Sequence, residues 1–262
     1  MLSMLKMDIR RLLKNKYLYI SICVFVLIMG ICIYSQNDAQ IIHGFQTLPQ
    51  EHEVGISSWI DYFLNIPLHF MYGFATKYIM LIFGIFIISF TCNEFNSGFI
   101  KNSCMMYKNR NMIAFNKFFM AIFLSVFTAL LAVIVSFVFG SLFIEQFEVG
   151  NVYELMSYTG VMIVVNIAYF SLLTFICFLT KNKTIGIVIA LLVTMGLTSA
   201  IFETVFGLFK VSELTNYTLS KITMSLPMLY DKTLTIRALL MSGIFVLLYN
   251  VLNVLLINKK DI

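Results

Sequence analysis

Few residues in this chain have the types and spacing that chemistry requires, and the most suggestive of them is the run Glu51-His52-Glu53. Carboxylates and imidazoles are common zinc ligands, but three consecutive side chains do not converge on one ion without ligands from elsewhere. The other two histidines, His43 and His69, stand apart from this run. We therefore interpret residues 51–53 as a solvated polar loop and expect no metal site.

Catalytic and nucleotide-binding motifs are missing from the sequence. It contains no GxxxxGK[ST] phosphate-binding loop, no HExxH, no GxSxG and no GxGxxG. The five cysteines form no CxxC pair, which favours free structural thiols over a zinc site or a disulfide framework. They are Cys23, Cys32, Cys92, Cys104 and Cys177. We predict no catalytic residue, no cofactor held by this chain and no enzymatic activity of its own.

Two charged residues lie inside otherwise apolar runs, where charge often marks an ion path. Lys77 and Glu203 each stand toward one end of such a run. A lysine in that position can extend its ammonium group to the membrane surface, and the glutamate can lie at the same depth. The apolar runs therefore lack the charge relay of an ion-coupled carrier, and any uphill transport must draw its energy from elsewhere.

The composition is that of an integral membrane protein. Of the 262 residues, 60% are hydrophobic and 12% are charged, whereas soluble domains carry about 25% charged residues. Apolar runs of this length are typical of helices that cross a hydrocarbon core of about 30 Å. We predict one all-α membrane domain over residues 1–262, with six transmembrane helices. Their expected bounds are 17–34, 73–92, 118–144, 158–179, 184–209 and 238–257.

The first 16 residues predict an amphipathic helix on the membrane surface. Lys6, Arg10 and Lys14 recur every four residues, and Leu2, Leu5, Ile9 and Leu12 form an apolar stripe. A basic face of this kind suits contact with anionic lipid headgroups. A cleaved signal peptide is the competing interpretation, but no small-residue cleavage site follows the first apolar run.

The distribution of basic residues predicts the topology. With six spans and a cytoplasmic N-terminus, 13 of the 18 Lys and Arg residues and only 3 of the 13 acids lie on the cytoplasmic side. The positive-inside rule therefore places both termini there. The outer loops are then 35–72, 145–157 and 210–237. We expect a short helix between Ser57 and Pro67 in the first, and short helices dipping back toward the membrane in the third, around Pro227.

Residues 91–117 form the most basic connection between two apolar runs. Lys101, Lys108, Arg110 and Lys117 are accompanied by one acid, Glu94. Basic and aromatic residues together can bind nucleic acid, but a segment held at the membrane surface more often meets headgroups or a protein partner. We expect no nucleic-acid partner.

The pattern within this connection resembles that of type-2 ABC transporter permeases. Members often carry the pattern acid-aromatic-x-x-Gly-x-Ile-[Arg/Lys] where the second span ends. This sequence has Glu94, Phe95, Gly98, Ile100 and Lys101 at that spacing, followed by Arg110, Ile113 and Lys117. One position departs, since Tyr107 stands where the family commonly has a small residue.

The resemblance implies that the connector 97–110 is a coupling helix that docks on a separate ABC ATPase subunit, which would hold ATP and Mg²⁺. The alternative for its apolar side chains is contact with the lipid surface. The implied coupling residues are Glu94, Gly98, Phe99, Ile100, Lys101, Met105, Met106, Tyr107, Arg110 and Lys117. Lys181 and Lys183 would form a second cytoplasmic contact, and residues 1–16 an elbow helix.

The function implied is that of a transmembrane subunit of an ATP-driven exporter in a bacterial plasma membrane. It would pair with a second copy or a relative and move an amphipathic substrate such as a peptide, antibiotic or lipid-like compound. The chain is similar in size and composition to peptide-export and lantibiotic-immunity permeases, including phenol-soluble-modulin exporters. A stand-alone resistance or sensor protein, which binds a ligand through its long outer loop, is the alternative.

Overall fold

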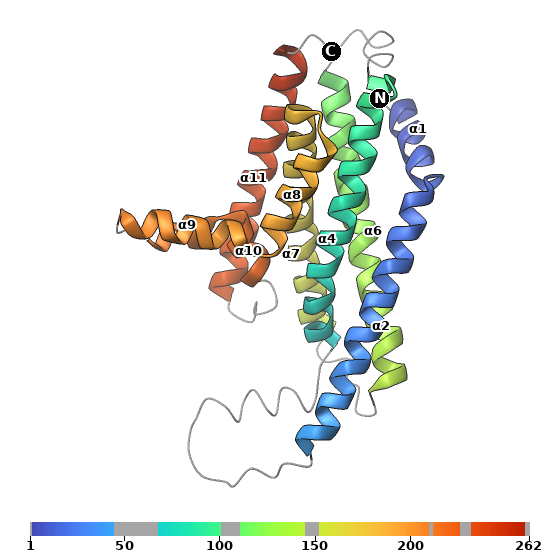
Figure 1. Cartoon of the computed structure of the whole chain (residues 1–262), viewed down its shortest axis with the longest axis vertical. Coiled ribbons are helices and arrows are strands. Elements are labelled where there is room, and N and C mark those ends of the chain that lie inside the picture. The colour runs from blue at the N-terminus through green and yellow to red at the C-terminus, as the bar shows by residue number, and fades with distance from the viewer. Residues whose placement is uncertain are drawn as a thin grey trace.

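The computed structural model describes residues 2–44, 68–100, 111–144, 152–209, 212–225 and 232–259, and these ranges contain helices and no strand. The long helices are α2 (Lys16–Gly44), α4 (Leu68–Asn96), α6 (Asn111–Phe143), α7 (Val152–Thr180) and α11 (Lys232–Lys259). The shorter ones are α1 (Leu2–Leu13), α8 (Lys183–Thr194), α9 (Leu197–Leu208), η1 (Ser212–Tyr217) and α10 (Leu219–Ser225). Figure 1 shows the long helices and α8 side by side in one bundle.

The predicted all-α, multi-pass membrane fold is confirmed in its main features. Five helices are long and apolar enough to cross a membrane: Lys16–Tyr34, Ala75–Asn96, Asn111–Phe143, Leu155–Thr180 and Thr235–Asn258. Their outer faces are apolar, with Leu27, Leu240 and Leu247 each more than 60% exposed. A surface this apolar would aggregate in water but is matched by lipid.

The fifth predicted span, 184–209, is wrong as a single continuous helix. It is divided into α8 and α9, whose axes differ by 70°. The break falls at Gly196, whose φ of +75° lies in the left-handed region that residues with a side chain rarely adopt. Helix α8 has 12 residues and therefore reaches about 18 Å, too short to cross alone. Counting the bent pair as one span gives six.

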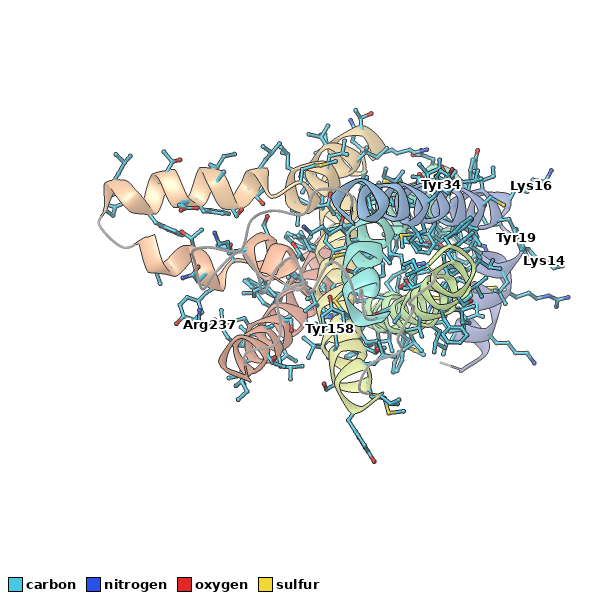
Figure 2. All side chains as sticks on the ribbon, turned by 90° about the horizontal axis from the view of Figure 1, so that it is seen from below. Lys14, Lys16, Tyr19, Tyr34, Tyr158 and Arg237 are labelled. Atoms are coloured by element: carbon cyan, nitrogen blue, oxygen red, sulfur yellow. The ribbon has the colours of Figure 1, made fainter. Side chains whose placement is uncertain are left out.

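Helix α9 leaves the bundle sideways at the break, and η1 and α10 return beside it (Figures 1 and 2). The two short elements agree with the short helices expected in 210–237, although Pro227 lies outside the described residues. Helices α2 and α4 extend farther into the predicted 35–72 loop than expected. The helix expected between Ser57 and Pro67 also lies outside the described residues.

Helix α7 is the centre of the bundle, because it packs against α4, α6, α8 and α11. Its Tyr169 and Phe170 are completely buried. Gly84 of α4 faces Tyr169 so closely that a Cβ atom there would lie 2.7 Å from the tyrosine hydroxyl oxygen. Small residues at helix interfaces permit such close backbone approach, and here one makes room for a large aromatic side chain. The interior around Tyr169 is thus closely packed by side chains of this chain.

Several connections meet at one end of the bundle, which we call the connector end. Helix α1, the last turn of α4, the start of α6, the α7–α8 turn and the last turns of α11 all lie there (Figure 1). The parts of the chain that the topology prediction assigns to the cytoplasm are therefore brought together in space. Which side of the membrane this end faces stays a prediction.

Candidate functional site

A buried group of charges lies at the connector end, and we call it the charge cluster. It consists of Asp8 and Arg11 from α1, Glu94 from the last turn of α4, and Asn116 and Lys117 from the second turn of α6. Asp8, Glu94 and Lys117 are at most 4% exposed, and Arg11 is one-third exposed. Three helices that are far apart in sequence thus meet through their ionic side chains.

The two carboxylates and two cations form a closed set of ion pairs. Lys117 Nζ lies 2.5 Å from Glu94 Oε2 and 3.4 Å from Asp8 Oδ2. Arg11 Nη1 lies 3.2 Å from Glu94 Oε1 and 3.4 Å from Asp8 Oδ1. The Asn116 amide donates to Asp8 Oδ2. Each carboxylate therefore faces both cations, and the formal charges of the four ionised groups cancel.

Such a set is stable when all four charged side chains are present, but removing any one of them is destabilising. Transferring an ion from water into a poorly polar interior costs several kcal/mol, and a well-placed counterion offsets most of that cost. Removing one partner leaves the other charge buried and unpaired, which costs about 3–5 kcal/mol. The pairing therefore holds α1, α4 and α6 in one relative position.

Aromatic rings cover the exposed side of the cluster. The Arg11 guanidinium carbon lies 3.7 Å from the centroid of the Phe99 ring and 5.8 Å from that of Phe90. Lys117 Nζ lies 5.4 Å from the Phe90 centroid. Cation–π attraction at this range adds about 0.5–2 kcal/mol per contact. Phe99, which the resemblance assigns to the docking face, is half-buried against Arg11 of its own chain.

Gly98 terminates α4 and starts the connector. Its φ of +70° lies in the left-handed region, and no other atom comes within 4 Å of the place a Cβ would occupy. The backbone angle, and not a lack of space, is therefore what favours glycine here. The Gly98 amide donates to the Phe95 carbonyl at 3.1 Å, which closes the last turn. The backbone therefore leaves α4 in a sharp turn at Gly98.

The root of the connector packs on the ends of three other helices. Ile100 is buried together with Ile113, Ala114, Phe178 and Ile257. The Phe95 ring meets Phe178 edge-on at 5.1 Å, and the Lys181 ammonium lies 5.9 Å from the Phe95 centroid. The second expected contact, Lys181 and Lys183, is thus adjacent to the connector, with Lys183 exposed at the start of α8.

The structure describes five of the ten implied coupling residues, and of these Gly98 and Phe99 are half-buried. Glu94, Ile100 and Lys117 are buried, so they support the connector from inside and present no surface to a partner. Lys101, Met105, Met106, Tyr107 and Arg110 lie outside the described residues.

Helix α1 agrees with the amphipathic helix predicted over 1–16. Lys6, Arg10 and Lys14 are exposed, and Leu12 is buried in the core.

Asp8 is the functional residue that sequence reasoning missed. The sequence does carry a signal for it, because positions 5, 8, 9 and 12 fall on one face of a helix, so Asp8 interrupts the apolar stripe of Leu5, Ile9 and Leu12. An acid on the buried face of a helix requires a partner. The partner, Lys117, is 109 residues away.

The remaining ionisable candidates are placed as follows. Glu203 of α9 is exposed and lies 3.8 Å from Lys221 Nζ in a surface ion pair. Lys77 is half-buried on α4. Glu51-His52-Glu53 lies outside the described residues, and the described ones contain no group of three side chains suited to holding a metal ion.

Comparisons with known proteins give no assignment. No family model matches this chain, and no curated protein is significantly similar to it.

Proposed function

We propose that this multi-pass membrane protein is the transmembrane subunit of an ATP-driven exporter, coupled through the connector 97–110 to a separate ATPase. The observation that carries the proposal is the charge cluster. It joins the α4 side and the α6 side of the connector to α1 through buried ion pairs. A force applied to the connector would therefore be passed to three helices at once instead of bending a loop.

The ATPase is proposed as the partner because the connector resembles that of type-2 ABC permeases. In that arrangement the connector end faces the cytoplasm of a bacterial cell, which agrees with the distribution of basic residues. The side chains that fill the core of one copy favour a pathway between two copies over one through a single bundle. An amphipathic substrate suits a pathway bounded by the apolar and hydroxyl side chains of such helices.

The test is transport by the full chain together with its ATPase. Met105→Asp with Met106→Asp introduces charge into the expected docking face. Export and transport-linked ATP hydrolysis should fall at least tenfold while the protein still reaches the membrane, because a buried charge at an interface costs several kcal/mol. The matched control is Tyr153→Asp, a highly exposed residue in the first turn of α7, a helix whose other end lies at the connector end.

Unchanged export by the connector variant would overturn the coupling role. Failure of any ATP-binding subunit to copurify with the chain in mild detergent would instead favour the stand-alone resistance or sensor protein.

A further inference from the structure

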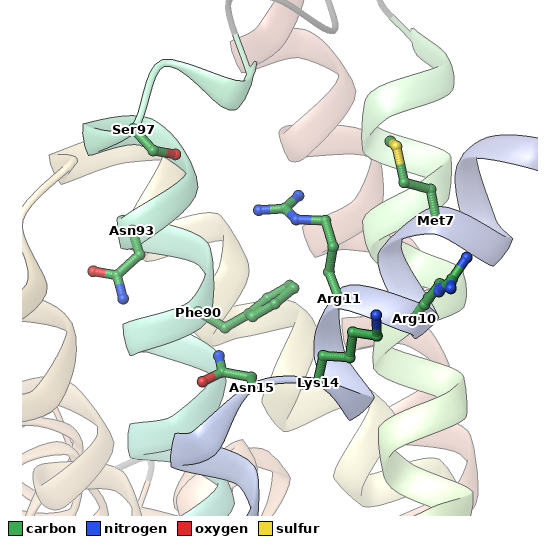
Figure 3. A pocket seen from close by; sticks show the side chains of 8 residues that line it. All are labelled: Met7, Arg10, Arg11, Lys14, Asn15, Phe90, Asn93 and Ser97. Carbon is green, nitrogen blue, oxygen red and sulfur yellow. The ribbon is translucent and has the colours of Figure 1, made fainter.

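A cavity beside the charge cluster has the shape and charge of a binding site. It lies between α1 and the last turns of α4 and has a volume of about 510 Å³, within the range of small-molecule pockets. Figure 3 shows Phe90 of α4 and Arg11 of α1 pointing into the gap between the two helices, with Arg10 and Asn93 at its margins. They are Met7, Arg10, Arg11, Lys14, Asn15, Phe90, Asn93 and Ser97.

The lining follows from the periodicity of the two helices. Met7 and Arg11 of α1 and Lys14, which directly follows α1, recur every three or four residues, so they share one face. On α4, Phe90, Asn93 and Ser97 do the same. Most of the lining surface is apolar, and the polar groups are cationic, amide or hydroxyl. The cavity is therefore amphipathic and positive.

Two of its three cations are available to a ligand. Arg11 is already engaged by Asp8 and Glu94 and stacks on Phe99. Arg10 and Lys14 pair with no carboxylate among the residues that the structure describes. Lys14 directly follows α1 and its amide donates to the Arg10 carbonyl at 3.1 Å, so the two cations lie about one turn apart. An anionic group placed between them would be attracted electrostatically by both cations.

The depth of the cavity in the membrane indicates the source of the anion. Residues 90–97 are at the end of the span Ala75–Asn96, where headgroups begin. Tyr17 and Tyr19 are exposed just after α1, as in the aromatic belt at a membrane interface, and Figure 2 shows Tyr19 with Lys14 and Lys16 along one edge of the bundle.

We infer that this cavity binds the headgroup of an anionic phospholipid. The phosphate lies between Arg10 and Lys14. The amides of Asn15 and Asn93 donate to the headgroup oxygens. The part of the acyl chains nearest the headgroup lies against Met7 and Phe90. This site differs from general attraction between a basic helix and a charged surface, because it requires one open groove between α1 and α4 and two particular cations. It does not depend on the proposed export function.

The test uses the purified full chain in a neutral detergent and dioctanoyl phosphatidylglycerol as the probe. Binding is measured by the rise in melting temperature and by microscale thermophoresis. Arg10→Gln with Lys14→Gln should weaken binding at least tenfold, because each basic residue near an anionic headgroup contributes about fivefold in affinity. Lys6→Gln with Lys16→Gln removes the same charge outside the cavity and should change affinity less than threefold.

A second variant fills the cavity without changing charge. Asn93 is exposed and is one of the residues that line the cavity, so Asn93→Phe should fold normally and weaken binding to a similar degree. Equal losses in the two glutamine pairs, or full binding by Asn93→Phe, would show diffuse attraction and overturn the site. Glycerol 3-phosphate that binds as tightly as the lipid would overturn the lipid assignment, as would equal affinity for dioctanoyl phosphatidylcholine.

Discussion

Lys117 is the residue whose loss tests the charge cluster most directly. Lys117→Met keeps the length and apolar stem of the side chain but removes the ammonium group, which lies 2.5 Å from Glu94 and 3.4 Å from Asp8. Arg11 alone then faces two buried carboxylates. Loss of one partner from a buried pair costs about 3–5 kcal/mol, so the free energy of unfolding should fall by that amount. The melting temperature in detergent should fall by about 10 °C.

The matched control is Lys6→Met, which removes an exposed lysine from α1 and should leave the free energy of unfolding within about 0.5 kcal/mol of the wild type. The sharper comparison is a double-mutant cycle with Glu94→Gln, measured by equilibrium unfolding in a graded denaturing detergent. Because Lys117→Met with Glu94→Gln removes one charge of each sign, the double variant should be more stable than the sum of the single losses by at least about 1 kcal/mol.

Two outcomes would refute this reasoning. Additive single and double variants would mean that the 2.5 Å contact carries no coupling energy. A loss of less than about 1 kcal/mol for Lys117→Met would mean that water reaches the carboxylates, because only a solvated acid tolerates losing its counterion so easily.

Two glycines give further tests. Gly98→Ala should cost about 1 kcal/mol in the free energy of unfolding because of the left-handed backbone alone, whereas Gly160→Ala, in a helix with equal space and an ordinary φ, should be neutral or slightly stabilising. Gly84→Ala should cost about 1–3 kcal/mol, because the new methyl group would meet Tyr169, while Gly243→Ala meets no atom within 4 Å. Thermal unfolding of the four variants measures both differences, and equal losses within either pair would contradict the explanation given.

The long helices were predictable from sequence because lipid imposes a simple rule. A hydrocarbon layer about 30 Å thick selects runs of about 20 apolar residues, and five such runs fold as the predicted helices. The fifth predicted span, 184–209, satisfies the same rule but is divided into the two helices α8 and α9. Hydropathy measures how apolar a segment is, whereas the break depends on the left-handed φ of Gly196, which an apolarity profile does not contain.

The connector shows the same division between local and distant information. Its glycine exit was predictable from Gly98, because the requirement is confined to one backbone angle. The burial of Glu94 and Lys117 was not predictable, because it also depends on Asp8 in α1, which is 109 residues from Lys117. When its acidic partner is not known, a lysine beside a basic connector is predicted to be exposed.

The position of Asp8 changes what α1 does in the fold. An amphipathic helix with only a basic face would be held by lipid alone and would be free to move with respect to the bundle. Asp8 and Arg11 instead tie α1 to both sides of the connector through contacts of 3.2–3.4 Å. Because the two cations that remain exposed line the cavity beside those contacts, a headgroup bound there would press on the same α1–α4 contact that the charge cluster maintains. Binding of a headgroup at the proposed site would therefore be coupled to the position of the connector through one pair of helix faces, and the coupling should disappear in any variant that detaches Asp8.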